Sequence, residues 1–308
     1  MQQLNLKKAI IWILYQDMSM RTEIRLLLHE QNAKVVEFGK LRDIHNTLAT
    51  DTPAALIASV DGQTAGFIKL MSQMRIGEFG RNPFLPTIAV TVDDSQTQWR
   101  KLVGAGFNLI LHAPFSRQNM WNVVERLYKD NRNFVVTKEY VGPQRIIGGK
   151  PERLLPHVIP IPVPNTLEGA ANGKPVRKDV IENSFNLITE ERVKNAAYMT
   201  LAKFESAIQD PDANAREVAK TVEGLCIEAL DGITMTSLAD AQEAFILSRD
   251  FAAAVCQYGF TDQDRTLSLE LCSVMSHTVL EHKTDNNEMR ELANRVRKRI
   301  HDKSGGQL

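Results

Sequence analysis

Residues 9–15 read AIIWILY, a short apolar run that no charged residue interrupts. A run of this kind is typical of a strand that is buried on both faces of a parallel sheet. Comparable runs recur along the first part of the chain, and segments with apolar residues at helical spacing separate them. We expect strands at 9–15, 34–38, 54–59, 87–92 and 108–111, and helices at 19–31, 41–49, 65–76, 95–105 and 116–128.

The alternation of strand and helix over residues 1–130 favours one architecture. Short connections between successive βα units make the strands parallel and place helices on both faces of the sheet. The predicted fold class is therefore α/β plus all-α: a five-stranded parallel, doubly wound sheet, and then a helical bundle.

Beyond residue 130 the pattern changes twice. Residues 131–180 are rich in proline and glycine, and we interpret them as a linker, either an extended spacer or a segment that docks on a domain face. Residues 181–308 are almost entirely helical by pattern, and their short loops favour an antiparallel bundle. The helices are expected near 189–208, 213–230, 236–259, 262–283 and 286–302.

The composition argues against several classes of protein. Lys plus Arg and Asp plus Glu number 37 each, so no basic excess points to nucleic acid. We find neither an apolar run of membrane-spanning length nor a signal-peptide pattern, and we expect a cytoplasmic protein without a membrane partner. The cysteines are odd in number and show no CxxC spacing, so we expect no disulfide framework and no zinc site. We also expect no other metal and no cofactor.

Several short motifs carry a resemblance to a known family. Residues 66–71 (GFIKLM) are similar to the opening of the third helix of two-component receiver domains, and residues 86–91 (PTIAVT) resemble their fourth strand. Residues 105–106 (AG) and 114–115 (PF) bracket the fifth strand as the family's Ala-Gly and Lys-Pro-Phe do. The order and spacing of these motifs cover residues 9–128, and the resemblance implies a receiver domain of the response-regulator type.

The resemblance also implies a phosphorylation site, and here that site is degenerate. In the family, two acidic residues after the first strand and one after the third hold Mg²⁺, and the last of these is the nucleophile. This chain has Gln16 and Asp17 at the first two positions and Ser59 at the third. Ala113 replaces the lysine after the fifth strand, and Thr91 keeps the hydroxyl after the fourth, which would hydrogen-bond a phosphoryl group.

One alternative keeps an acceptor. Asp61 lies two residues beyond Ser59, and a shift of the third strand by two would keep the same face and place Asp61 at the mouth of the site. Otherwise, Asp61 and Gly62 form a turn, which that dipeptide favours. Asp17 could likewise be only a helix cap and Thr91 only a strand-end residue. His112 either lines the mouth or is a loop histidine.

The helical part resembles a histidine-phosphotransfer domain at residues 248–260, SRDFAAAVCQYGF. Arg249 falls at the place of the phosphorylated histidine, and Ala253 at the place of a glycine that lets a receiver approach. Arginine stays protonated and cannot act as that nucleophile. A plain apolar helix explains the same pattern. His277 and His282 are five residues apart and lie on different helix faces, so a shared metal is not expected.

These observations predict a non-catalytic adaptor or regulator of a bacterial two-component pathway, and not an enzyme. It would bind receivers, kinases or phosphotransfer proteins, or a second copy of itself, and residues 108–128 are a usual partner surface in the receiver family. Residues 133–145 (NFVVTKEYVGPQR) resemble a tail of some alphaproteobacterial receivers. The alternatives are an active phosphorelay protein that uses Asp61 or His277, and an output regulator that binds nucleic acid through the bundle.

Overall fold

The computed structural model describes residues 4–147, 150–151, 158–209 and 215–305. It divides into two compact units, Met1–Ile188 and Thr189–Leu308, each of which is considered by itself. The boundary falls inside a helix and not at residue 130 or 180, where the sequence pattern had suggested domain ends.

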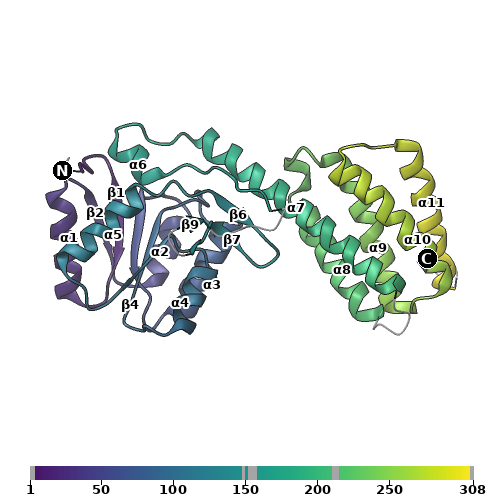
Figure 1. The fold of residues 1–308 in the computed structure, drawn as a ribbon, viewed down its shortest axis with the longest axis horizontal. Helices are drawn as coiled ribbons and strands as arrows, with labels where there is room; N and C mark the ends of the chain where they lie inside the picture. Colours follow the sequence, from purple (N-terminus) through teal and green to yellow (C-terminus); the bar gives the residue numbers. More distant parts are fainter. Residues whose placement is uncertain (1–3, 148–149, 152–157, 210–214, 306–308) are drawn as a thin grey trace. The chain divides into compact units, whose positions relative to one another are not determined.

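The first unit contains a five-stranded parallel sheet with the order β2-β1-β3-β4-β5 (Figure 1). This order is that of the doubly wound flavodoxin and receiver type, in which the functional edge is formed by the carboxyl ends of the strands. The predicted α/β class is confirmed. The strands are β1 (Ile10–Leu14), β2 (Lys34–Phe38), β3 (Ala55–Ser59), β4 (Thr87–Thr91) and β5 (Leu109–His112).

Five helices cover the two faces of this sheet, and their bounds agree with the expected ranges to within a residue or two. Successive side chains of a strand point to opposite faces of the sheet. The segment of β1 is apolar throughout because helices cover both of these faces. Ile11 and Ile13 pack toward α1 and α5, whereas Trp12 and Leu14 pack toward α2 and α3. The helices are α1 (Met18–Glu30), α2 (Leu41–Leu48), α3 (Thr64–Arg75), α4 (Gln96–Gly104) and α5 (Arg117–Tyr128).

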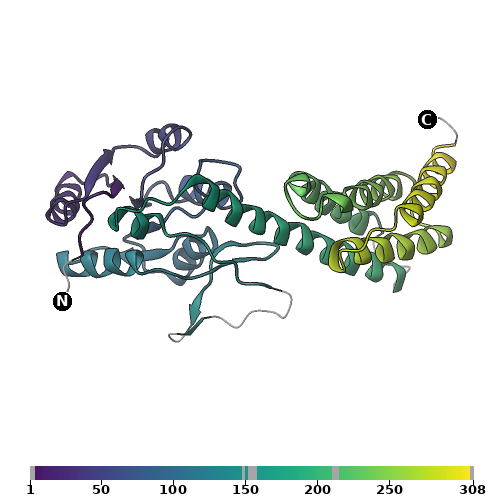
Figure 2. The ribbon, with the colours of Figure 1, turned by 90° about the horizontal axis from the view of Figure 1, so that it is seen from above.

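The described part of residues 131–180 differs from a free linker, because it packs on the first unit. Strands β6 (Phe134–Val136) and β7 (Val141–Pro143) form an antiparallel hairpin, and β6 also bridges to Ile161. Helix α6 (Thr166–Ala171) buries Leu167 completely in the cluster that includes Ile11. The described part of this segment is therefore not an extended spacer; it docks on a face of the first domain. A further ribbon, β8 (Ile146–Ile147) with β9 (Lys150–Pro151), extends from this unit (Figure 2).

Asn165 connects two helix ends in this docked segment. Its side-chain oxygen accepts hydrogen bonds from the first amides of α6, at 3.0 and 3.1 Å. Its side-chain nitrogen donates to the backbone carbonyls of Leu127, Tyr128 and Asp130, at 2.9, 3.2 and 3.0 Å. One side-chain amide thus caps the start of α6 and also binds carbonyl groups at the end of α5.

A buried arginine ties the start of the docked segment to the amino edge of the sheet. Arg75 is fully buried, and its guanidinium donates to the carbonyls of Gly106 and Leu85 at 2.9 and 3.1 Å and to Asn108 at 3.0 Å. Burial lowers the pKa of Arg75 to about 10. The guanidinium also lies 5.2 Å from the ring centre of Phe134, so the cation supports the hairpin as well as the sheet.

The second unit is helical, as the sequence pattern predicts. Two of the helices, α10 and α11, are joined at one end by the carboxylate of Asp264, which is buried and accepts from Arg299 and Lys303 at 2.8 Å each. The helices are α7 (Lys178–Gln209), which enters the unit at Thr189, α8 (Ala215–Leu230), α9 (Gln242–Tyr258), α10 (Asp262–Met275) and α11 (Asn286–Lys303). In the described part of the chain, no helix is both long and apolar enough to cross a bilayer.

Candidate functional site

The carboxyl edge of the sheet brings most of the expected site residues together. Strand β3 ends at Ser59, which pairs with Val90 of β4, so the strand register is the unshifted one. Gly62 has φ +71°, as a turn after the strand requires. Asp61 nevertheless reaches the mouth, because the turn directs its side chain toward the end of β4.

Asp61 and Thr91 are joined there. The Thr91 hydroxyl donates to one carboxylate oxygen of Asp61 at 2.7 Å, and the backbone amide of Val92 donates to the other at 3.0 Å. The same Thr91 oxygen accepts from the amide of Asp93 at 3.2 Å, and the Thr91 side chain is buried. Both oxygens of this carboxylate and the hydroxyl that faces it are therefore engaged within the chain.

The other candidate carboxylate, Asp17, caps α1. Its side chain accepts a hydrogen bond from the backbone amide of Met20 at 2.8 Å. Of the two interpretations of Asp17, metal ligand or helix cap, the structure thus has the helix cap. Gln16 precedes it in the loop after β1. Asp17 and Asp61 both lie near the buried phenol of Tyr15. Burial raises the pKa of Tyr15, and these two carboxylates raise the pKa further, so this edge carries local negative charge.

The donor set at this edge does not fit Mg²⁺. That ion requires near-octahedral oxygen coordination, which proteins usually supply with one or two free carboxylates together with waters or substrate phosphates. Asp17 is used as a cap, and Asp61 already accepts from Thr91 and Val92. Within the described ranges, no group of three or more His, Cys, Asp or Glu side chains is placed to hold a metal ion.

The end of β5 contributes no cation where the receiver resemblance implies a lysine. Ala113 is buried, and its amide donates to the carbonyl of Thr91 at 2.8 Å, which extends the pairing of β4 with β5. His112 is the last residue of β5, and its Nε2 lies 2.9 Å from the carbonyl of Val92. His112 therefore does line the mouth, where it ties β5 to the loop after β4.

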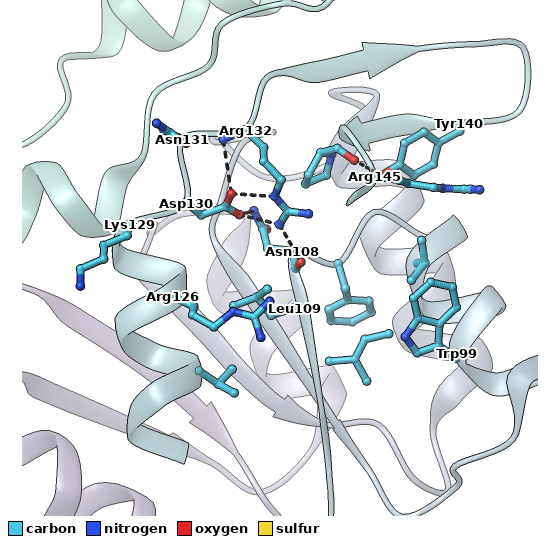
Figure 3. Close-up of a pocket in the computed structure, with 15 residues that line it drawn as sticks. Trp99, Asn108, Leu109, Arg126, Lys129, Asp130, Asn131, Arg132, Tyr140 and Arg145 are labelled. Carbon is cyan, nitrogen blue, oxygen red and sulfur yellow. Dashed lines mark hydrogen bonds and ion pairs between the residues drawn. The ribbon is translucent and has the colours of Figure 1, made fainter. Parts of the chain in front are cut away.

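A second feature, which we call the α4–β5–α5 groove, lies along the open edge of β5. It is a pocket of about 590 Å³ whose floor is apolar and whose far end is closed by the β6–β7 hairpin (Figure 3). The groove overlaps the partner surface expected at residues 108–128 only in part, because α4, the start of the docked segment and the hairpin also line it. The lining residues are Trp99, Val103, Phe107, Asn108, Leu109, Ile110, Val123, Arg126, Lys129, Asp130, Asn131, Arg132, Tyr140, Pro143 and Arg145.

In the second unit, the two expected site residues share a face of α9. Arg249 and Ala253 are both half-buried, and the guanidinium of Arg249 binds the carboxylate of its neighbour Asp250 at 2.7 Å. Phe251 is in the core, as the plain apolar interpretation expects, whereas Tyr258 is 41% exposed. His277 is exposed on a π-turn beyond α10.

The basic run at residues 295–299 is largely neutralised inside the second unit. Arg295 binds Glu270 at 2.5 Å, and Arg297 binds Glu243 at 2.9 Å. Arg299 belongs to the Asp264 cluster already described. These pairs connect α11 to α9 and α10, so the run contributes little free positive charge to the surface.

The strand order and the edge geometry define a receiver-like α/β domain at the start of the chain. No protein-family model and no curated protein matches the sequence. In structure, the chain is similar to the chemotaxis response regulator CheY4 of Vibrio cholerae, with 17% identity over 39% of this chain and 98% of that one, at a TM-score of 0.35. It is also similar to the receiver domain of the sensor histidine kinase PA1611 of Pseudomonas aeruginosa, with 19% identity over 40% and 98% of the two chains and a TM-score of 0.35.

A response regulator receiver protein from Burkholderia phymatum is a third similar structure. It is 19% identical, covers 39% of this chain and 94% of its own, and has a TM-score of 0.33. All three similarities concern a part of this chain that is the length of one receiver domain, and none extends over the helical unit.

Proposed function

We propose that this protein is a non-catalytic adaptor of a two-component signalling pathway, whose receiver-like domain acts by binding other proteins. The observation that carries the proposal is the carboxylate of Asp61, which holds the Thr91 hydroxyl at 2.7 Å and the Val92 amide at 3.0 Å. In a receiver, the hydroxyl at this position would serve the phosphoryl group. Here an internal carboxylate takes that place.

The neighbouring positions support the same function. Ser59 ends β3 where an acyl-phosphate would have to form, and a hydroxyl cannot form one. The buried methyl group of Ala113 supplies no countercharge for a phosphoryl group. A domain that keeps the fold but lacks the acceptor, the metal ligands and the cation retains its surfaces for binding.

The helical unit fits the same role. Arg249 on α9 is paired with Asp250 but remains partly exposed, beside the small side chain of Ala253. A partner receiver with a carboxylate cluster could exchange this local pair for a charge-assisted contact. Binding would then replace phosphoryl transfer in both units.

The test is incubation of the full chain with a radiolabelled small-molecule phosphodonor and Mg²⁺, beside a phosphorylatable receiver as positive control. We expect no label on this chain. Label that survives in Ser59→Ala but disappears in Asp61→Asn or His277→Gln would overturn the proposal and identify the acceptor.

One observation favours the alternative of an active phosphorelay protein, because Asp61 does lie at the mouth beside a hydroxyl. Its carboxylate would have to leave Thr91 and Val92 before it could attack a phosphodonor. The Asp61→Asn arm of the experiment separates the two functions. The nucleic-acid alternative has no such support, since Arg295, Arg297 and Arg299 of the basic run are paired with acidic side chains.

A further inference from the structure

The β6–β7 hairpin turns the open side of β5 into a walled groove, and the groove combines an apolar floor with unpaired cations. Trp99 of α4 is 53% exposed, and Leu109 and Ile110 of β5 are half-buried in the same lining, with their side chains on opposite faces of the sheet. An exposed tryptophan next to aliphatic side chains is typical of an anchor position in a protein interface. The floor therefore suits apolar side chains of a bound segment.

The hairpin wall is held in one conformation by its own contacts. The Tyr140 hydroxyl donates to the carbonyl of Pro143 at 2.7 Å, and the amide of Gln144 donates to the carbonyl of Asn133 at 2.8 Å. A Cβ on Gly142 would lie 2.7 Å from the Tyr140 hydroxyl oxygen and 3.1 Å from the Cα of Gly106, so only glycine permits this close packing. Residues 142–144 thus build the wall, and they position Arg145, the next residue in the chain.

Two arginines face this groove without an acidic partner. Over the part of the chain that the structure describes, Arg126 of α5 has no ion pair, and Arg145 contacts only the ring of Tyr140, 5.1 Å from its centre. Figure 3 shows them on opposite sides of the pocket. The other cations differ: Lys129 points away and binds Glu125 at 2.6 Å, and Arg132 binds Asp130 at 2.7 Å.

The only acidic side chain in the lining is already neutralised. Asp130 accepts from Arg132 and from the side-chain amide of Asn108, and these contacts outweigh the effect of its burial and lower the pKa of Asp130. Arg126 and Arg145 therefore leave the groove with a net positive charge. Arginine recognises carboxylates through paired hydrogen bonds, and apolar surface between two such arginines selects against a bare polyanion.

We propose that the α4–β5–α5 groove binds an acidic peptide segment of a partner protein, with an apolar side chain on Trp99 and Ile110 and carboxylates on Arg126 and Arg145. This inference rests on the proposed binding function and gives the chemistry of the partner. The hairpin, through Arg145, supplies one of the two charge contacts, so the tail selects which segments fit.

The experiment is selection of a displayed library of random peptides on the immobilised full chain, with counter-selection on an Arg126→Gln/Arg145→Gln variant. We expect enrichment of peptides that combine Asp or Glu with aromatic or aliphatic residues. Enrichment of basic or neutral peptides, equal retention by the double variant, or no enrichment at all overturns the inference.

Fluorescence anisotropy with a selected peptide then measures each contribution. Arg126→Gln, Arg145→Gln and Trp99→Ala should each weaken binding about tenfold, as expected for a charge-assisted or anchor contact. Lys129→Gln, a matched loss of charge at a lining residue whose ammonium group points away and binds Glu125, should leave the affinity within about twofold. Loss of binding only in Lys129→Gln, or displacement of the peptide by random-sequence duplex DNA at lower concentration than by unlabelled peptide, contradicts the inference.

The two proposals can fail separately. Phosphorylation of Asp61 would overturn the adaptor function, whatever the peptide result. Failure of the peptide selection on a chain that takes no label would overturn the acidic-peptide inference and leave the adaptor function standing.

Discussion

The Thr91 hydroxyl donates a 2.7 Å hydrogen bond to the carboxylate of Asp61, which joins the end of β4 to the turn after β3. Val92, the next residue, donates its amide to the other carboxylate oxygen. One acidic side chain therefore holds the start of the β4–α4 loop. In this structure the loop conformation is held by contacts within the chain.

Removal of this carboxylate should loosen the loop. In Asp61→Ala, the Val92 amide loses its acceptor, and we expect its hydrogen exchange to accelerate at least about tenfold, since a charged hydrogen bond contributes about 1.5–3 kcal/mol. Exchange measured by mass spectrometry on peptides that cover residues 87–95 tests this. Asp94→Ala, which removes an exposed carboxylate nearby, is the control, and equal acceleration in both variants would refute the role of Asp61.

Asn165 should stabilise the first unit through both of its side-chain atoms. Asn165→Ala removes the cap of α6 and the donor to the end of α5, and we expect a loss of about 2 kcal/mol in the free energy of unfolding. Asn165→Asp keeps the acceptor for α6 and removes the donor. Full stability in the Asp variant would show that the contacts with Leu127, Tyr128 and Asp130 contribute nothing.

Tryptophan fluorescence makes this measurement specific to one unit. The three tryptophans of the chain, at positions 12, 99 and 121, all belong to the first unit. Urea unfolding followed by tryptophan emission therefore reports the first unit, and Asn131→Ala, at an exposed position of the same region, should leave the midpoint unchanged.

Arg75 should be difficult to replace. Its guanidinium satisfies several buried acceptors, among them the carbonyls of Pro83, Leu85 and Gly106. Arg75→Met would leave these acceptors unpaired, at a cost of more than about 3 kcal/mol in unfolding free energy. Arg75→Lys should not restore stability, because an ammonium group lacks the planar array of donors. A stability loss below about 1 kcal/mol in Arg75→Met, by tryptophan emission, would contradict this prediction.

The second unit should lose stability in acid through Asp264. Burial by itself would raise the pKa of Asp264, but donors from Arg299, Lys303 and Thr261 outweigh burial and lower the pKa below its ordinary value. A carboxyl group with a lowered pKa in the folded state stabilises the fold above its unfolded pKa of about 3.9, and this contribution disappears as the pH falls through the folded pKa.

Asp264→Asn tests this pH dependence. We expect the variant to be about 3 kcal/mol less stable than the wild type at pH 7, because Arg299 and Lys303 lose a buried partner. The difference should shrink as the pH falls below about 4, because the wild-type carboxyl group gains a proton first in the unfolded chain and, at lower pH, in the folded chain as well. Far-UV circular dichroism during denaturation follows the helices, with Asp262→Asn as an exposed control; a difference that is independent of pH would refute the assignment to Asp264.

Local patterns predicted a large part of this structure. Apolar runs and helical spacing located the strands and helices of the sheet domain, because period and propensity are properties of adjacent residues. The end of β3 at Ser59 follows from the same patterns, whereas β5 continues one residue beyond the expected end, to His112. The sequence also shows directly that Ser59 and Ala113 stand where the receiver resemblance implies an acid and a lysine. The turn at Asp61 and Gly62 was likewise predicted from its dipeptide.

Other features could not be predicted from local pattern. Residues 131–180 looked like a linker because proline and glycine disrupt periodicity, and no local signal shows that Asn165 meets the end of α5. Arg75 reads as an ordinary basic residue at the end of a helix, yet its partners come from the start of β4 and β5.

The sequence by itself determined the order of secondary structure, the sheet architecture, and which residues stand at the positions where the receiver resemblance implies phosphorylation residues. Only the tertiary structure decided that Asp61 meets Thr91, that the tail forms a wall of the α4–β5–α5 groove, and that Arg126 and Arg145 face this groove from opposite sides. The physical reason is that hydrogen bonds and charge pairs between segments depend on which strand ends and loops the sheet brings together. Residues 30 or more positions apart carry no local sign of that meeting.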